Sequence, residues 1–124
     1  MTTRPVARSM FQFAARQRYD GYIGSDAWLR RRRRWLAIER RAHGGRIYCA
    51  ICGCVWGTKT SGGELHHLTY DRLGDERHED LVALCAADHR AVERLFVLGA
   101  YRGVPRELAM RSVVAALRAK AVGR

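Results

Sequence analysis

Long apolar runs are absent from this sequence: no segment approaches the ~20 apolar residues that a membrane-spanning helix needs. The first residues, MTTRPVARSMFQFAARQR, also lack the uninterrupted apolar core of a secretory signal. They are rich in arginine and contain no acid, which is typical either of an organellar transit peptide or of a basic arm that orders on a partner. We see no internal repeat, and a chain of 124 residues has room for one small domain with a modest core.

Acidic residues are scarce, and their distribution is uneven. Residues 1–48 hold twelve arginines against three acids, residues 49–98 hold five basic residues against eight acids, and residues 99–124 hold six against one. The formal charge of +11 therefore arises from two basic flanks around an acidic centre. This segregation favours a polyanionic partner, most simply nucleic acid, although charge alone leaves an acidic protein surface as an alternative.

Helical patterns surround a short β region. The segment GSDAWLRRRRRWLAIERRAHGG predicts a helix that begins at Ser25 or Asp26 and ends at Gly44 and Gly45. ELHHLTY and LVALC predict strands, whereas AADHRAVERLFVL and PRELAMRSVVAALRAK have helical spacing. We therefore expect an α+β protein. It would have a basic arm over 1–24, helical in part at most, a core domain over 25–98 and a C-terminal helical extension over 99–124.

The cysteines are too crowded for a disulfide framework. RIYCAICGC predicts a short strand running into a tight turn, and in a chain without an export signal its spacing favours metal binding. Cys49 and Cys52 would join Cys85 and Asp88, which are three residues apart at a helix start, in a tetrahedral zinc site. Cys54 is a spare that can replace Asp88 or Cys52. If zinc has been lost, the thiols are simply small buried apolar groups.

A second group of ligands is predicted on the other face of the same helix. His89 and Glu93 are four residues apart and share a side that Asp88 does not. The pair His66-His67 lies in a strand, where adjacent side chains point to opposite faces. If the strand twists locally, one imidazole could then face a cation while the other faces a substrate. A cation that stabilises phosphate charge, together with an imidazole base, is the minimum for phosphodiester hydrolysis.

The stretch YCAICG…ELHHLTYDRLGDERHEDLVALCAADH resembles the HNH endonuclease family, in the branch with an added cysteine zinc site. SDAWLRRRRRWLAIERRAHGGRIYCAIC is similar to the tryptophan-containing helix before the first cysteine pair of small phage-type and bacterial members. The resemblance covers roughly residues 22–97. It implies a ββα-metal (His-Me finger) core, in which a β-hairpin with a long loop packs on a helix and the metal lies between them.

The resemblance also implies a role for each matching position. His66 and His89 would ligate the catalytic divalent cation, and His67 would be the general base that activates water. Glu93 stands where some members have a further metal-binding histidine, and Asp80 stands where the family usually has its central asparagine. The structural zinc ligands would be Cys49, Cys52, Cys85 and, at the fourth cysteine position, Asp88.

The departures from the family pattern carry chemical consequences. An ionised Asp80 only accepts hydrogen bonds, so it must brace the base-bearing loop differently from asparagine or ligate a cation itself. Glu93 hardens the catalytic site, which favours Mg²⁺ or Mn²⁺ over Zn²⁺. Asp88 is an unusual fourth zinc ligand. An inactive, zinc-stapled DNA-binding module is therefore an alternative to an active enzyme.

The function predicted from the sequence is a metal-dependent DNA endonuclease. Its basic helix would hold the phosphate backbone without reading sequence, through Arg30, Arg31, Arg32, Arg33, Arg34, Arg40 and Arg41. A protein-interaction subunit whose basic face meets an acidic protein is a further alternative. We expect a cytoplasmic protein of a bacterium or a phage-infected host, with no membrane partner. A homodimer, or a phage packaging or restriction partner, is compatible with so small a chain.

Overall fold

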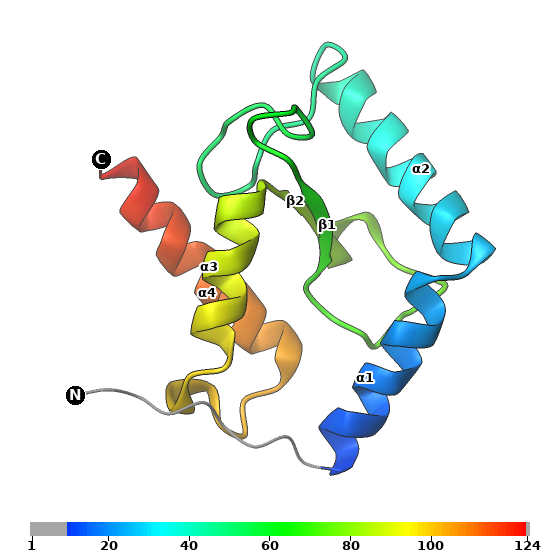
Figure 1. The fold of residues 1–124 in the computed structure, drawn as a ribbon, viewed down its shortest axis with the longest axis vertical. Coiled ribbons are helices and arrows are strands. Elements are labelled where there is room, and N and C mark those ends of the chain that lie inside the picture. Colours follow the sequence, from blue (N-terminus) through cyan, green and yellow to red (C-terminus); the bar gives the residue numbers. More distant parts are fainter. Residues whose placement is uncertain (1–9, 124) are drawn as a thin grey trace.

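The sheet at the centre of the molecule is small, and helices lie on both sides of it (Figure 1). The computed structural model describes residues 10–123. In that range the elements are α1 (Met10–Ile23), α2 (Asp26–Ala42), β1 (Glu64–His67), β2 (Leu81–Leu84), α3 (Ala86–Phe96) and α4 (Arg106–Val122), with short 3₁₀ turns at His78–Asp80 and Gly99–Tyr101. The expected α+β class is confirmed.

Helix α2 begins and ends where the sequence predicts. Oγ of Ser25 accepts a hydrogen bond from the backbone N–H of Trp28 at 3.2 Å and so caps the first turn. Gly44 and Gly45 follow the last turn with φ angles of +65° and +92°, which side chains with a Cβ disfavour. Trp28 and Trp35 are 5% and 4% exposed. Both indoles are core anchors, as their spacing indicates.

The register of the sheet decides which way each histidine faces. Strands β1 and β2 are antiparallel, with Leu65 opposite Ala83 and His67 opposite Leu81. These four side chains share one face of the pleat, the face toward α2. His66 therefore turns to the other face, where α3 and α4 pack.

Two hydrophobic clusters enclose the sheet. The cluster on the α2 side comprises Trp28, Trp35, Leu36, Ile47, Trp56, Leu65, Leu81 and Ala83. The cluster on the α3 and α4 side comprises Cys49, Ile51, Leu68, Leu84, Cys85, Val92, Met110 and Val113. Strand β1 thus holds its two histidines between two packed layers.

Two expectations about local structure need correction. The segment 1–24 was predicted as a basic arm, helical in part at most, but its residues 10–23 form a helix, α1, that packs on the domain; residues 1–9 lie outside the described range. Aromatic side chains of α1 pack against the domain, and the hydroxyl of Tyr22 donates to Oε1 of Glu76 at 2.9 Å. The cysteine segment forms a turn closed by one isolated bridge between Tyr48 and Val55, not a strand.

The length and hydropathy of the helices bear on membrane insertion. None of the helices within residues 10–123 is both long and apolar enough to cross a bilayer.

Candidate metal centres

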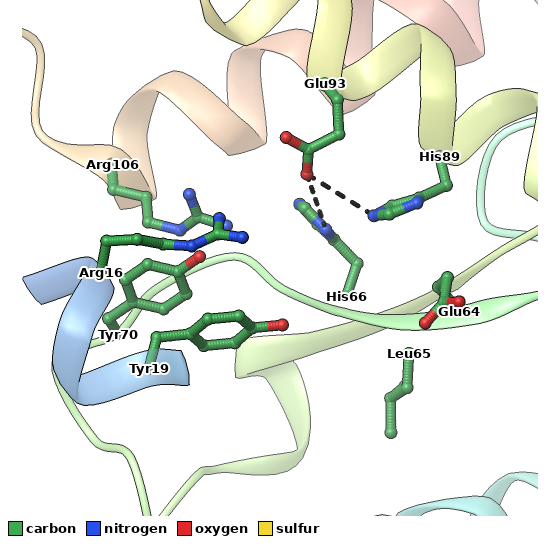
Figure 2. A pocket seen from close by; sticks show the side chains of 9 residues that line it. All are labelled: Arg16, Tyr19, Glu64, Leu65, His66, Tyr70, His89, Glu93 and Arg106. Atoms are coloured by element: carbon green, nitrogen blue, oxygen red, sulfur yellow. Dashed lines mark ion pairs between the residues drawn. The ribbon is translucent and has the colours of Figure 1, made fainter. Parts of the chain in front are cut away.

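Three potential ligands from β1 and α3 converge on one point. His66 comes from β1, while His89 and Glu93 lie one turn apart on α3. Oε1 of Glu93 lies 4.0 Å from Nδ1 of His66 and 3.5 Å from Nε2 of His89 (Figure 2). Ligand atoms of this trio all lie within 4.8 Å of one another. Two imidazoles and one carboxylate in this arrangement could hold a divalent cation.

The charge states of the trio suit metal binding. Burial, assisted by the positive charge of Arg106, lowers the pKa of His66 to about 3. Its imidazole is therefore neutral near pH 7 and keeps a lone pair to offer. A hydrogen bond from His89 lowers the pKa of Glu93, which keeps that carboxylate ionised. Nε2 of His66 lies 3.3 Å from Sδ of Met110, so Nδ1 is the nitrogen that faces the other two ligands.

A cavity of about 170 Å³ opens beside the trio. Its remaining walls include Arg16 and Tyr19 from α1, Tyr70 from the loop after β1, and Arg106 from α4. The rings of Tyr19 and Tyr70 stack at 4.5 Å between centroids, and the guanidinium of Arg106 lies 3.9 Å from the centroid of Tyr70. This volume is below the ~300–1,000 Å³ of drug-sized pockets, so the cavity suits an ion and a small anionic group.

His67 occupies the opposite face of the strand, as the alternation predicts. Its ring is enclosed, with centroids 4.7 Å from Trp28 and 5.4 Å from Tyr19, and the residue is only 1% exposed. Nε2 lies 2.9 Å from Oε2 of Glu76, and Nδ1 is buried without a hydrogen-bond partner among the described residues. Burial lowers the pKa of His67 against the opposing pull of Glu76. The face toward which His67 turns is packed rather than open.

Asp80 braces the loop between the two strands. Its carboxylate, 0% exposed, accepts hydrogen bonds from Nη2 and Nε of Arg72 at 2.6 and 2.8 Å and from the backbone N–H of Arg77 at 2.9 Å. The Arg72 hydrogen bonds are the main reason that the pKa of Asp80 is lowered. Its backbone carbonyl also accepts from the N–H of Leu68 at 2.8 Å. The sequence left two roles open for Asp80, bracing the loop and ligating a cation. In the structure its carboxylate is engaged in the hydrogen bonds that brace the loop.

The four cysteines form a second ligand group, the cysteine cluster. Cys49, Cys52 and Cys54 lie on the turn after α2, and Cys85 is the N-cap residue of α3. Their sulfur atoms all lie within 4.8 Å of one another, and the four thiols are free of disulfides. Four thiolates around one point match the tetrahedral coordination of zinc, so the cluster could hold a structural, zinc-like ion.

The fourth ligand position of this cluster has two candidates. Cys54, named from the sequence as a possible substitute for Asp88 or Cys52, lies within the cluster, and the backbone N–H of Cys49 donates to its carbonyl at 2.8 Å. Asp88 lies next to the cluster: its Oδ2 is 3.2 Å from Sγ of Cys49 and 3.4 Å from Sγ of Cys85. Burial raises the pKa of the Cys54 thiol to about 11, so in the absence of metal that thiol is protonated near pH 7.

The arginine helix α2 presents most of its cations to solvent. The exposed members are Arg30, Arg33, Arg34, Arg40 and Arg41. Arg32 is half-buried, with its guanidinium 5.8 Å from the ring centroid of Trp56. Arg31 corrects the expectation that the whole run faces phosphate: it is 7% exposed, and its Nε donates to the carbonyl of Glu76 at 3.0 Å. Arg31 lies on the side of α2 that faces the core, so its side chain has a structural role.

Several residues of the two sites were not predicted from the sequence. Glu76 holds His67 and Tyr22, yet it lies within the acidic loop DERHED and shares no pattern with either. Arg106 donates to the carbonyl of His67, 39 positions away. Arg16 belongs to the segment expected to be an arm. Cys54, by contrast, was named from the sequence as a spare ligand, because it lies two residues after a cysteine pair.

Comparison of the chain with protein-family models, with curated proteins and with solved structures gave no match. Membership of the HNH family therefore stays a prediction from the sequence motif. The function has to be inferred from the side chains that the fold brings together.

Proposed function

We propose that the protein is a metal-dependent phosphodiester hydrolase acting on DNA, with its cation held by His66, His89 and Glu93. The observation that carries this proposal is the convergence of the trio beside a pocket whose wall includes two guanidinium groups. A cation there would supply charge stabilisation for a phosphoryl oxygen and for the leaving oxygen. The carboxylate suits Mn²⁺ and Mg²⁺, whereas the two imidazoles suit Zn²⁺ and Ni²⁺.

The order of elements around the trio supports the ββα-metal interpretation. Strands β1 and β2 form an antiparallel pair joined by a long loop, and α3 follows β2 directly. The first strand contributes one ligand, and the helix contributes two. We propose that the cysteine cluster binds zinc. The zinc would link the turn after α2 to Cys85, the N-cap residue of α3. This zinc site would fix the position of the helix that carries His89 and Glu93.

His67 is the proposed general base, and Glu76 prepares it for that role. If Nε2–H donates to the Glu76 carboxylate, Nδ1 is left unprotonated and able to accept a proton. The lowered pKa keeps the ring neutral near pH 7, as a base requires. His67 lies on the opposite face of β1 from the trio, with the rings of Tyr19 and Trp28 against it, so the role of base requires the His67 ring or α1 to shift.

The exposed arginines of α2 are the proposed DNA contacts. Contacts of this type neutralise phosphates and release counterions, so binding weakens steeply as salt is raised. Changing Arg33 and Arg34 together to glutamine should reduce the slope of log affinity against log salt by about 2. Arg31→Gln should not behave in this way, because Arg31 is buried; it should lower stability instead.

Cleavage of supercoiled plasmid tests the proposal. The wild type and His89→Ala would be assayed with Mn²⁺, Mg²⁺, Ni²⁺ and Zn²⁺, with His43→Ala as the matched control because His43 is an exposed histidine at the end of α2. We expect cation-dependent nicking or cutting by the wild type and by His43→Ala. His89→Ala should lose that activity.

Salt-sensitive DNA binding without cleavage under any of these cations would reject the hydrolase and support the inactive zinc-stapled module. Binding to heparin but not to duplex DNA would instead support an acidic protein partner. Equal activity of His89→Ala and the wild type would remove the trio from the mechanism.

A further inference from the structure

Arg106 is a cation whose side chain is half-buried. Among the described residues it forms no ion pair, and its environment consists of the Tyr70 ring at 3.9 Å, the Phe96 ring at 5.2 Å and the His67 carbonyl, to which Nη2 donates at 2.9 Å. Its Nε is buried without a hydrogen-bond partner. Burial lowers the pKa of this guanidinium, although Tyr70 and the negative charge of Glu93 act in the opposite direction. Burying a charged group or a hydrogen-bond donor costs free energy unless an opposite charge or an acceptor pairs with it.

A second guanidinium faces the same space. Arg16 lines the pocket from α1, with its charge 5.2 Å from the Tyr19 centroid, and Figure 2 shows it beside Arg106, both reaching toward the trio. The positive charge of each opposes that of the other, and Arg16 contributes to the lowered pKa of Arg106. Asp20 pairs with Nε of Arg16 at 3.0 Å but is itself 59% exposed, so water screens that pair.

The charge of the pocket depends on the cation. Its lining holds two guanidinium groups, those of Arg16 and Arg106, and two carboxylates, those of Glu64 and Glu93. With neutral imidazoles these charges cancel. A divalent cation on the trio leaves an excess of two positive charges in a cavity of about 170 Å³, enough for a small anion.

We infer that this pocket is a cation-gated phosphate site, in which Arg106 binds a phosphoryl oxygen only after the divalent cation has loaded on His66, His89 and Glu93. The guanidinium fork of Arg106 lines the pocket and suits the tetrahedral phosphoryl group. The tyrosine stack fixes Arg106 in place before the anion arrives. The inference rests on the cation site of the proposed function but does not need hydrolysis to occur.

Reciprocal binding is the signature of such a site. By linkage, a cation that tightens phosphate binding is itself bound more tightly by the same factor when phosphate is present. Couplings between sites typically amount to about 5–150-fold, and charges this close should place the factor at tenfold or more. A pocket that binds anions only because its arginines are accessible to solvent would bind phosphate equally tightly with and without the cation.

Calorimetry on the full chain can measure this coupling. Dimethyl phosphate, inorganic phosphate and acetate would each be titrated with and without saturating Mn²⁺. For the wild type we expect Mn²⁺ to tighten binding of both phosphates by about tenfold or more, and of acetate by less, because acetate lacks the tetrahedral oxygens. Tighter binding of inorganic phosphate but not of dimethyl phosphate would overturn the assignment to a diester.

Three variants assign the effect to residues. Arg106→Gln should abolish the coupling, and Arg106→Lys should retain part of it because the charge remains without the fork. Arg111→Gln is the control, since Arg111 lies on the same helix, is 43% exposed and contacts Glu107 instead. If Arg106→Gln does not fold, as judged by circular dichroism, Arg16→Gln takes its place and should weaken the coupling.

Wild-type phosphate affinity that ignores Mn²⁺, or full coupling in Arg106→Gln, would overturn the inference. If Mn²⁺ does not bind, or binds equally to His89→Ala, the cation site fails, and the proposed function fails with it. If Mn²⁺ binds at the trio and plasmid is cleaved while phosphate affinity is unchanged by Mn²⁺, only the gated phosphate site is refuted.

Discussion

Glu76→Gln should switch the proton of His67 from one ring nitrogen to the other. Glu76 is 5% exposed, and its two oxygens have different partners. Oε1 accepts from the hydroxyl of Tyr22 at 2.9 Å and from the backbone N–H of Gly74 at 3.0 Å, while Oε2 lies 2.9 Å from Nε2 of His67. An amide keeps one oxygen and replaces the other with a donor.

The backbone decides which way the new amide points. The N–H of Gly74 can only donate, so the oxygen of the substituted side chain must stay on that side. The NH₂ group then faces His67, whose Nε2 must accept, and the ring proton moves to Nδ1. That nitrogen has no partner among the described residues, so a buried N–H is left unsatisfied at a cost of about 1–3 kcal/mol. It also stops being a base, and losing a general base typically costs about 10²–10⁴ in rate.

Nitrogen-15 long-range correlation spectra report the tautomer of His67 directly. Urea unfolding gives the change in stability, and plasmid cleavage gives the change in rate. Glu79→Gln is the matched control, because Glu79 is an exposed neighbour in the same loop. If Glu76→Gln keeps the proton on Nε2 and cleaves like the wild type, neither the hydrogen-bond assignment nor the role of His67 survives.

Further outcomes follow from the two ligand groups and the core. Cys54→Ser should lower the zinc content of the purified protein, whereas Asp88→Asn should not; the reverse result in elemental analysis would restore Asp88 as the ligand. Without added divalent cation, stability should fall as the pH drops from about 6.5 toward 3, by up to about 1.4 kcal/mol per unit from His66, because the unfolded imidazole takes up a proton that the folded one, with a pKa of about 3, refuses. Urea unfolding of the wild type and His66→Gln at several pH values would detect this as a shallower slope in the variant. Gly63→Ala should destabilise the fold by about 1–3 kcal/mol in the same assay, because its Cβ would lie 2.3 Å from Nε1 of the Trp56 indole; unchanged unfolding would contradict that packing.

The elements that periodicity and capping specify were predictable from the sequence. Helix α2, both strands and α3 lie close to where apolar spacing, Ser25 and the glycine pair indicate. The opposite orientation of His66 and His67 follows from the pleat alone. The grouping of His89 and Glu93 with one of the paired histidines was anticipated from the helical spacing, and the choice of His66 came from the resemblance to the HNH family.

The features that could not be predicted from the sequence depend on long-range packing. No local pattern indicates that Tyr19 and Arg16 would fold back onto the strand as α1, or that Arg31 alone of its run would turn inward. The partner of His67 is Glu76, selected by the path of an irregular loop. The turn closed by the backbone hydrogen bond from Cys49 to Cys54 brings all four cysteines together, which the sequence spacing left open.

Cys85 is both a member of the cysteine cluster and the residue that begins α3, and His89 follows it by one turn. If the protein binds both the proposed zinc and the proposed catalytic cation, a chelator would act at two places whose consequences look alike. Stripping the sulfur-bound ion would loosen the start of the helix and scatter the imidazole and carboxylate that lie along it. Activity lost to EDTA would then not return with manganese alone, and the order in which the two ions are restored would matter.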